Sequence, residues 1–153
     1  MEPRIDYGTA SPKGLAAMLG MERHVHASGL DPKLIELVKL RASLINGCAY
    51  CVDMHTKVAR SLGETEQRLY AVSVWEETPF FSDRERAALA WTEAVTLVNV
   101  DHVPDEVYAL ARPQFSEQEL VDLTLTIVTI NGWNRLAIAF RTVPGTFQLD
   151  SGG

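Results

Sequence analysis

The chain places two cysteines and a histidine within one short stretch, as Cys48, Cys51 and His55. On a helix, steps of three and four residues bring all three side chains to one face over two turns. If that helix begins at Cys48, its unpaired N–H groups and its dipole favour a thiolate, the nucleophilic form of cysteine. His55, one turn from Cys51, can accept the thiol proton or protonate a leaving group. The spacing therefore predicts nucleophilic redox chemistry at a cysteine pair.

Glu36 is a candidate partner for this face, because it lies in a run of leucine, isoleucine and valine. A carboxylate at such a position is expected to be at least partly buried, and a buried carboxylate needs a partner. A turn at residues 46–47 would fold its helix against the one that carries His55. Glu36 would then act as a base or orient the imidazole. The alternative is a structural ion pair with Lys39 or Arg41.

The cysteines have two other interpretations. Inert core thiols are one, since cysteine is among the most buried residue types. A zinc site is the other, but it needs a fourth ligand beside Cys48, Cys51 and His55, and the chain has no second cysteine pair. We expect neither a metal nor a bound cofactor. His24 and His26, two residues apart, face different sides of a helix and are interpreted as surface residues.

Helix-capping residues punctuate the chain, whereas alternating runs bounded by hairpin turns are missing, which predicts an all-α fold. Capping boxes at residues 82–85 and 116–119 mark two helix starts. The Asn-Gly pair at 131–132 is a weak point of the last helix, either a break or a close helix–helix contact. We expect about seven helices, over residues 11–28, 31–46, 48–63, 65–75, 82–99, a short stretch from 104, and 116–142.

The composition indicates one globular domain over residues 1–153, with a motif core at 32–63 and a mobile tail near 146–153. Hydrophobic residues make up 46% of the chain and charged residues 22%, which excludes a disordered chain or a coiled coil. With 14 basic and 20 acidic residues the net charge is −6, so nucleic acid is not an expected partner.

The same composition bears on location. The most apolar stretch, residues 120–130, falls short of the roughly 18 apolar residues that a membrane span needs, so we expect no membrane association. The first residues show no signal peptide. A single Cys-x-x-Cys without a larger disulfide framework indicates a reducing compartment. We therefore expect a cytoplasmic protein.

The stretch from Glu36 to His55, Glu-x11-Cys-x2-Cys-x3-His, resembles the alkylhydroperoxidase AhpD-like branch of the carboxymuconolactone decarboxylase family. Residues 80–89 and 131–137 resemble two further blocks of that family. The resemblance implies an AhpD-like helical bundle that assembles into homotrimers or homohexamers and reduces peroxides with its cysteine pair. It also implies two partners, a peroxide substrate and a thiol or dithiol reductant that restores the cysteines.

A role for each residue of the motif follows from the resemblance. Cys51 would attack the peroxide oxygen and become a sulfenic acid, and Cys48 would resolve it as a disulfide. Glu36 and His55 match the proton-relay positions. Prototype members carry a histidine directly before the second cysteine, where this chain has Tyr50, and tyrosine is not a base at neutral pH. The relay expected in this chain is therefore shorter.

Three functions compete with peroxide reduction. A carboxymuconolactone decarboxylase-like enzyme is the first, although the decarboxylase branch lacks the cysteine pair that this chain carries. The others are a thiol–disulfide exchange protein and a non-catalytic helical oligomer. Thiol titration with stoichiometric peroxide discriminates among them, because only a peroxidase loses both thiols rapidly.

The apolar pattern gives a separate reason to expect association between subunits. The helices predicted over 31–46 and 116–142 are apolar on more than one face, and such helices must be buried on all sides. A chain of this length fully encloses few helices, so part of this surface is expected to meet another subunit. The alternative is that 116–142 is the central helix of a monomer. Trp75, Trp91 and Trp133 are interpreted as core or subunit-contact residues.

Overall fold

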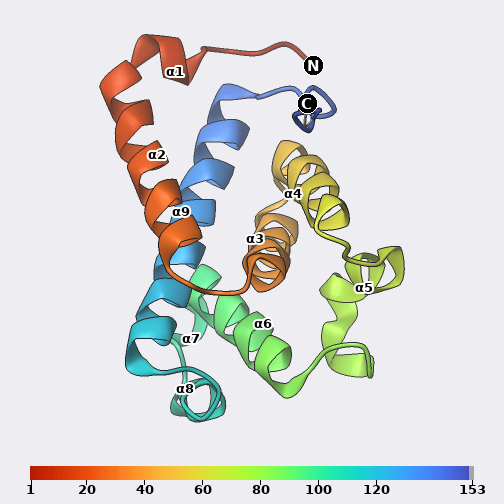
Figure 1. The fold of residues 1–153 in the computed structure, drawn as a ribbon. Coiled ribbons are helices and arrows are strands. Elements are labelled where there is room, and N and C mark those ends of the chain that lie inside the picture. The colour runs from red at the N-terminus through yellow and green to blue at the C-terminus, as the bar shows by residue number, and fades with distance from the viewer. Residues whose placement is uncertain (152–153) are drawn as a thin grey trace.

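The computed structural model describes residues 1–151, and all regular structure within them is helical, without a β-strand (Figure 1). The all-α prediction is therefore confirmed. The helices follow one another as α1 (Tyr7–Ala10), α2 (Pro12–Ala27), α3 (Pro32–Asn46), α4 (Ala49–Ser61), α5 (Glu66–Ala71), the 3-10 helix η1 (Val72–Glu77), α6 (Asp83–Thr96), α7 (Val98–Asp101), α8 (Asp105–Ala111) and α9 (Glu117–Phe140).

The expected number of helices, about seven, is too low, because the described residues form nine α-helices and one 3-10 helix. The helix expected over 65–75 divides at Val72 into α5 and η1, in which Val74 has non-helical dihedral angles. The helix expected over 82–99 ends at Thr96, and the four-residue α7 follows. Helix α1 also has four residues. Helices of a single turn escape sequence patterning because an apolar period needs roughly 11 residues to register.

The capping residues set the main boundaries as the sequence predicts. Ser82 and Ser116 each accept a hydrogen bond from the N–H of the glutamate three residues on, while that glutamate accepts the serine N–H, so both capping boxes are confirmed. Helix α3 ends at Gly47, whose φ of 69° is one that residues with a Cβ rarely adopt. The chain turns there into α4, which packs against α3.

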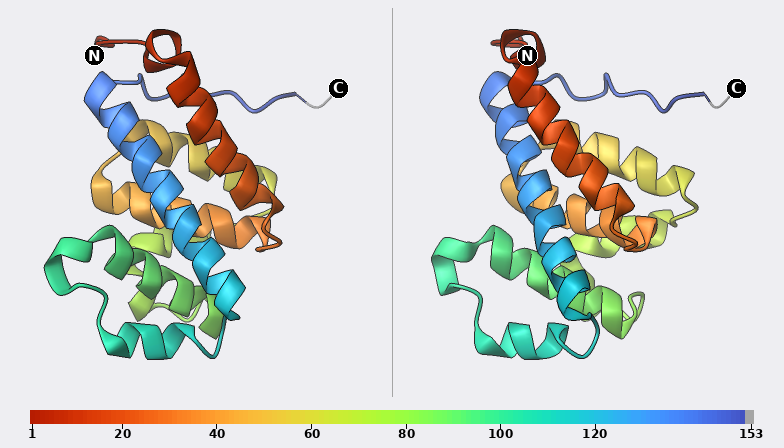
Figure 2. Two further views of the ribbon diagram at one scale, coloured as in Figure 1. Left: turned by 90° about the vertical axis from the view of Figure 1, so that its left-hand side faces the viewer. Right: turned by 60° about the vertical axis from the view of Figure 1, so that its left-hand side comes forward.

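Helix α9 runs without a break through Asn131 and Gly132. A Cβ at position 132 would lie 2.9 Å from Cε of Met18, too close for an ordinary contact. Gly132 therefore lies where α2 contacts α9, with the flexible end of Met18 against it, which is the second of the two alternatives for this pair. The two helices lie side by side in Figures 1 and 2.

Helix α3 is central to the fold, because α4, α6 and α9 all pack on it. Residues 34–43 are buried except Arg41, so the chain itself covers both apolar faces of this helix. Two apolar clusters meet along it. One joins α2, α3, α6, α8 and α9, and the other joins α3, α4, α5, η1 and α6. Helix α3 therefore needs no second subunit to cover its apolar residues.

Helix α9 differs from α3 in this respect. Its residues Leu123 and Ile127 are completely buried, whereas Val121, Val128 and Ile138 are 59%, 52% and 46% exposed. Val121 and Ile138, the ends of this exposed strip, lie about five helical turns apart along α9. The apolar surface that a single chain leaves uncovered therefore lies on α9 and not on α3.

The remaining sequence predictions concern the tryptophans and the tail. Trp75 and Trp91 are buried in the two core clusters, as predicted, while Trp133 is only partly buried. The tail predicted over 146–153 includes residues 152–153, which lie outside the described residues. In its described part, Lys57 Nζ donates a hydrogen bond to the Phe147 carbonyl at 3.1 Å. Across residues 1–151, every helix is too short or too polar to span a membrane.

Candidate active site

The turn between α3 and α4 brings Glu36 and His55 together. The distance from His55 Nδ1 to Glu36 Oε2 is 2.7 Å, and the two residues are 5% and 3% exposed. The alternative partners of Glu36 are wrong, because Lys39 pairs with Glu22 and Arg41 pairs with a glutamate of α6. An ionised Glu36 accepts a hydrogen bond from the Nδ1–H group of His55. Nε2 of His55 is then the nitrogen that can take or give a proton.

Cys48 and Cys51 are joined by a disulfide, with their Cα atoms 5.3 Å apart. Cys48 is the N-cap of α4, and its sulfur accepts a hydrogen bond from the Cys51 N–H at 3.3 Å. The helix therefore begins where the sequence predicts, with its unpaired N–H groups beside the sulfurs. Both cysteines are buried, at 1% and 3% exposure.

A cavity of about 360 Å³ lies between α2, α4 and α9 and reaches the cysteine pair. Cys51 and His55 are part of its wall, whereas Cys48 is not among its lining residues. A molecule in this cavity would therefore contact both Cys51 and His55. The full set of lining residues is Tyr7, Leu15, Leu19, Glu22, His26, Tyr50, Cys51, Met54, His55, Trp133 and Ala137.

Sequence reasoning missed most of this wall. Tyr7 and Tyr50 both line it, and burial raises the pKa of Tyr7, with the nearby Tyr50 adding to the rise. Trp133, interpreted as a core or contact residue, also lines it, although the block at 131–137 in the family resemblance pointed to this part of α9. His26 lines it as well, while its side chain is 54% exposed, in keeping with a surface residue.

A chain of amide side chains fixes the end of α3 to α9 close to this site. Asn46 Nδ2 donates to the side-chain oxygens of Asn131 and Asn134, both at 2.9 Å, and Asn134 Nδ2 donates to Ser43 Oγ at 3.0 Å. Asn134 is completely buried. These bonds hold the turn before Cys48 against α9, so the position of the cysteine pair depends on helices far apart in sequence.

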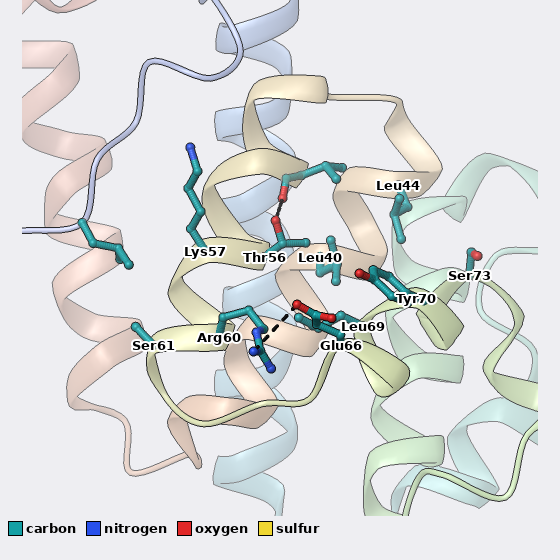
Figure 3. A pocket seen from close by; sticks show the side chains of 12 residues that line it. Leu40, Leu44, Thr56, Lys57, Arg60, Ser61, Glu66, Leu69, Tyr70 and Ser73 are labelled. Atoms are coloured by element: carbon teal, nitrogen blue, oxygen red, sulfur yellow. Dashed lines mark hydrogen bonds and ion pairs between the residues drawn. The ribbon is translucent and has the colours of Figure 1, made fainter.

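A larger cavity, of about 770 Å³, lies on the other side of α4, against α3 and α5 (Figure 3). It contains no cysteine or histidine among its lining residues. Thr56 Oγ1 donates to the Val52 carbonyl of its own helix at 2.7 Å, and Arg60 lies 3.8 Å from Glu66. These two side chains pair within their own segment, so volume alone does not mark the chemical site.

Within residues 1–151, no group of three or more His, Cys, Asp or Glu side chains is arranged to hold a metal ion. The arrangement at the cysteine pair is a disulfide with the buried Glu36–His55 pair nearby. Such a site can transfer electrons through its sulfurs and protons through His55.

Known proteins that are similar to this chain include members of one family. A family model described as the carboxymuconolactone decarboxylase family matches residues 12–94. The uncharacterized protein YdfG of Bacillus subtilis is 45% identical over 91% of this chain and 95% of its own length. Alkyl hydroperoxide reductase AhpD of Acidobacterium capsulatum is 44% identical, over only 35% of this chain and 27% of its own length.

One solved structure is similar over nearly the whole chain. It is the crystal structure of ATU0492 from Agrobacterium tumefaciens, a protein of unknown function for which the role of an antioxidant defence protein AhpD is suggested. The TM-score is 0.92 at 44% identity, and the alignment covers 95% of this chain and 100% of that one. The AhpD-like fold expected from the sequence is therefore confirmed.

Proposed function

The chain belongs to the carboxymuconolactone decarboxylase family, and from this premise we propose that it is a thiol-dependent hydroperoxide reductase of the alkylhydroperoxidase type. The observation that carries the proposal is the cavity wall, where Cys51 and His55 meet the same space. Cys48 is bonded to Cys51 from outside that wall. A disulfide in this position is the state that such an enzyme reaches after one turnover.

In the first step, the Cys51 thiolate attacks the terminal oxygen of a hydroperoxide ROOH and breaks the O–O bond. The sulfur loses two electrons and becomes a sulfenic acid. The second oxygen leaves as an alkoxide and is protonated to the alcohol ROH. His55 takes the proton from the Cys51 thiol and returns it to the alkoxide, so the step consumes no outside proton.

In the second step, the Cys48 sulfur attacks the sulfenic sulfur of Cys51, and water leaves with the Cys48 proton. The product is the disulfide that the structure contains. A dithiol reductant then exchanges with this disulfide, becomes a disulfide itself and returns both cysteines to thiols. The reductant supplies the two electrons that the peroxide removed.

Glu36 is a positioning residue in this scheme. Its carboxylate holds Nδ1 of His55 at 2.7 Å and has no place in the cavity wall. It therefore leaves Nε2 of His55 as the nitrogen that exchanges a proton and stabilises the imidazolium that forms when the thiol proton is transferred. Tyr50 lines the cavity as well, and its hydroxyl can donate a hydrogen bond to the substrate.

Peroxide reduction is favoured over lactone decarboxylation because the cavity wall contains a cysteine with a second cysteine within disulfide distance. Decarboxylation has no need of such a pair. The relatives named for a peroxide-related role, AhpD of Acidobacterium capsulatum and ATU0492, point in the same direction.

The test is a titration of free thiols. The protein is reduced with dithiothreitol, freed of reductant and mixed with one equivalent of cumene hydroperoxide, and both of its thiols should disappear as one equivalent of alcohol forms. Thiols that persist for hours, as in a non-catalytic protein, would contradict the proposal. A thiol–disulfide exchange protein would lose its thiols to an oxidised dithiol, and not to the peroxide.

We also propose that the chain forms homotrimers, or homohexamers built from trimers, in the cytoplasm, where reduced thiols can regenerate the cysteine pair. The exposed Val121, Val128 and Ile138 on α9 support an association between copies. Light scattering coupled to size exclusion at micromolar concentration should give three or six times the 16.9 kDa of one chain. A mass of one chain would overturn the oligomer and leave the peroxidase proposal standing.

A further inference from the structure

The cavity beside Cys51 contains a charged residue that peroxide reduction does not use. Glu22 of α2 lines this cavity, and its side chain is 21% exposed. Its Oε1 accepts hydrogen bonds from Lys39 Nζ and from His26 Nε2, the latter at 3.0 Å. Its Oε2 accepts the indole N–H of Trp133 at 2.9 Å. Three side chains, one each from α2, α3 and α9, thus fix one carboxylate in the wall.

Lys39 stands behind Glu22, away from the cavity. It is 1% exposed and is not among the lining residues, so its charge has only protein around it. Burial alone would raise the pKa of Glu22, but the charge and hydrogen bond of Lys39 and the bond from Trp133 outweigh burial and lower that pKa. This lowering favours the carboxylate form of Glu22, which lies at the cavity, while the Lys39 side chain lies in the core.

Within residues 1–151, the rest of the wall contains no permanently charged cation to pair with an anion. Among the described residues that line the cavity, none is lysine or arginine. The two imidazoles in the wall, His26 and His55, each already face a carboxylate, Glu22 and Glu36. Behind His55 lies a second carboxylate, Glu36. The apolar part of the wall comes from Leu15, Leu19, Met54, Trp133 and Ala137.

We propose that Glu22 is a specificity-determining residue that restricts the cavity to uncharged hydroperoxides with an apolar body and excludes anionic ones such as carboxylated hydroperoxides. This inference rests on the proposed function, whose substrate class it specifies. An anionic group entering the cavity loses its water and meets the negative end of the Glu22–Lys39 pair. An uncharged apolar body meets leucine, methionine and tryptophan surface and carries no such cost.

The two ends of the Glu22–Lys39 pair should act in opposite ways on an anionic substrate, because Glu22 repels it and Lys39 attracts it. Glu22→Gln removes the negative end and leaves the positive charge of Lys39 behind the wall. Lys39→Met removes the positive end and leaves the carboxylate alone. Preference for the uncharged substrate should therefore fall in the first variant and rise in the second, with the double variant between wild type and Glu22→Gln.

The experiment compares two hydroperoxides that differ in one charge. Cumene hydroperoxide and its para-carboxylated analogue have the same O–O group and the same aromatic body. The readout is the second-order rate of thiol loss in reduced protein at neutral pH, with hydrogen peroxide as the probe that has no organic body. Wild type should react about tenfold faster with the uncharged compound, and Glu22→Gln should lower that ratio about tenfold. An unchanged ratio in Glu22→Gln overturns the proposal.

Two further measurements keep the proposal testable if Glu22→Gln does not fold. The double variant Glu22→Gln with Lys39→Met leaves no unpaired charge, and its ratio should lie below that of wild type. An equal or higher ratio contradicts the role of Glu22. Rates with hydrogen peroxide should change little among the variants, which separates discrimination by charge from loss of the catalytic cysteines.

Binding of the product alcohols separates this inference from the proposed function. The alcohols of the two hydroperoxides are titrated into the oxidised protein by calorimetry, where no chemistry takes place. The uncharged alcohol should bind about tenfold more tightly than the carboxylated one. If no hydroperoxide oxidises the thiols, the proposed function fails while this result still supports the cavity preference. Equal binding, or no binding of either alcohol, overturns the inference.

Discussion

Two cavities lie on the two sides of helix α4, and they differ in size and in the residues that line them. The side facing α2 and α9 has a cavity of about 360 Å³ with Cys51 and His55 in its wall. The side facing α3 and α5 has one of about 770 Å³, lined by Val52 and Thr56 (Figure 3). Val52 and Thr56 each follow a residue of the first wall by one position. A rotation of about 100° around the same helix thus separates the two environments.

The difference lies in how the polar groups are paired. On the larger side, Thr56 bonds to its own helix, and Arg60 bonds to the Glu64 carbonyl and reaches Glu66 through side chains that are both about half exposed. On the smaller side, Glu36 and His55 pair across two helices with almost no exposure. Polar groups held in fixed pairs away from water are the ones that can direct a proton, and surface pairs are screened.

The largest expected effect that separates the two sides is the loss of Cys51. Cys51→Ser should abolish peroxide-driven oxidation down to the rate of buffer alone, because no second thiol lines the cavity. Cys48→Ser should keep the first step and accumulate a sulfenic acid that dimedone traps, as mass spectrometry of the labelled peptide would show. Dimedone on Cys48 in the Cys51→Ser variant would reverse the two roles.

A smaller effect is expected from Glu36. Glu36→Gln should slow thiol oxidation at pH 7 by about tenfold to a hundredfold, because the substituted amide no longer stabilises the imidazolium of His55. The pH profile of the rate should shift as well, which a merely structural role would not produce. Glu66→Gln, the same change on the larger side of α4, serves as the control. Equal rates in the two variants would return Glu36 to a structural role.

The next effect concerns stability and not rate. Lys39→Met should destabilise the fold by about 3 kcal/mol, the lower end for a broken buried pair, since Glu22 is partly exposed and keeps its bonds from Trp133 and His26. Urea unfolding gives the value. Adding Glu22→Gln should recover most of the loss, and a double variant no more stable than Lys39→Met would show that the two residues are not coupled.

The stability lost in Lys39→Met should depend on pH in one direction. Lys39 and its hydrogen bond lower the pKa of Glu22 below its ordinary value, so the pair contributes stability above that ordinary value. The contribution is lost as the pH falls through the lowered pKa. The gap in stability between wild type and Lys39→Met should therefore be full at neutral pH and narrow in acid. A gap that grows in acid contradicts the assignment.

The smallest effect is expected from a substitution in the larger cavity beside α4. Arg60→Ala should change the free energy of unfolding by less than about 1 kcal/mol, because Arg60 and Glu66 are 3.8 Å apart with side chains 49% and 61% exposed. Its rate of thiol oxidation should equal that of wild type. A rate loss comparable to that of Glu36→Gln would show that the two sides of α4 are coupled in thiol oxidation.

The sequence by itself determined the helical class, the main helix boundaries and the chemical motif. Capping boxes at Ser82 and Ser116 and the turn at Gly47 are local features, and local backbone chemistry decides them. The spacing of Cys48, Cys51 and His55 likewise fixes one helix face, whatever surrounds it. The pairing of Glu36 with His55 followed from the same turn, because two adjacent helices joined by a short loop lie antiparallel.

The tertiary structure decided what surrounds that motif. The wall of the cavity draws on Tyr7, Glu22 and Trp133, residues up to 126 positions apart, and no local pattern brings them together. The burial of Lys39 and its pairing with Glu22 depend on where α2 crosses α3. Sequence periodicity shows that a helix has an apolar face but not which helix covers it. The partners of α3 and the open strip on α9 therefore appear only when all the helices are packed.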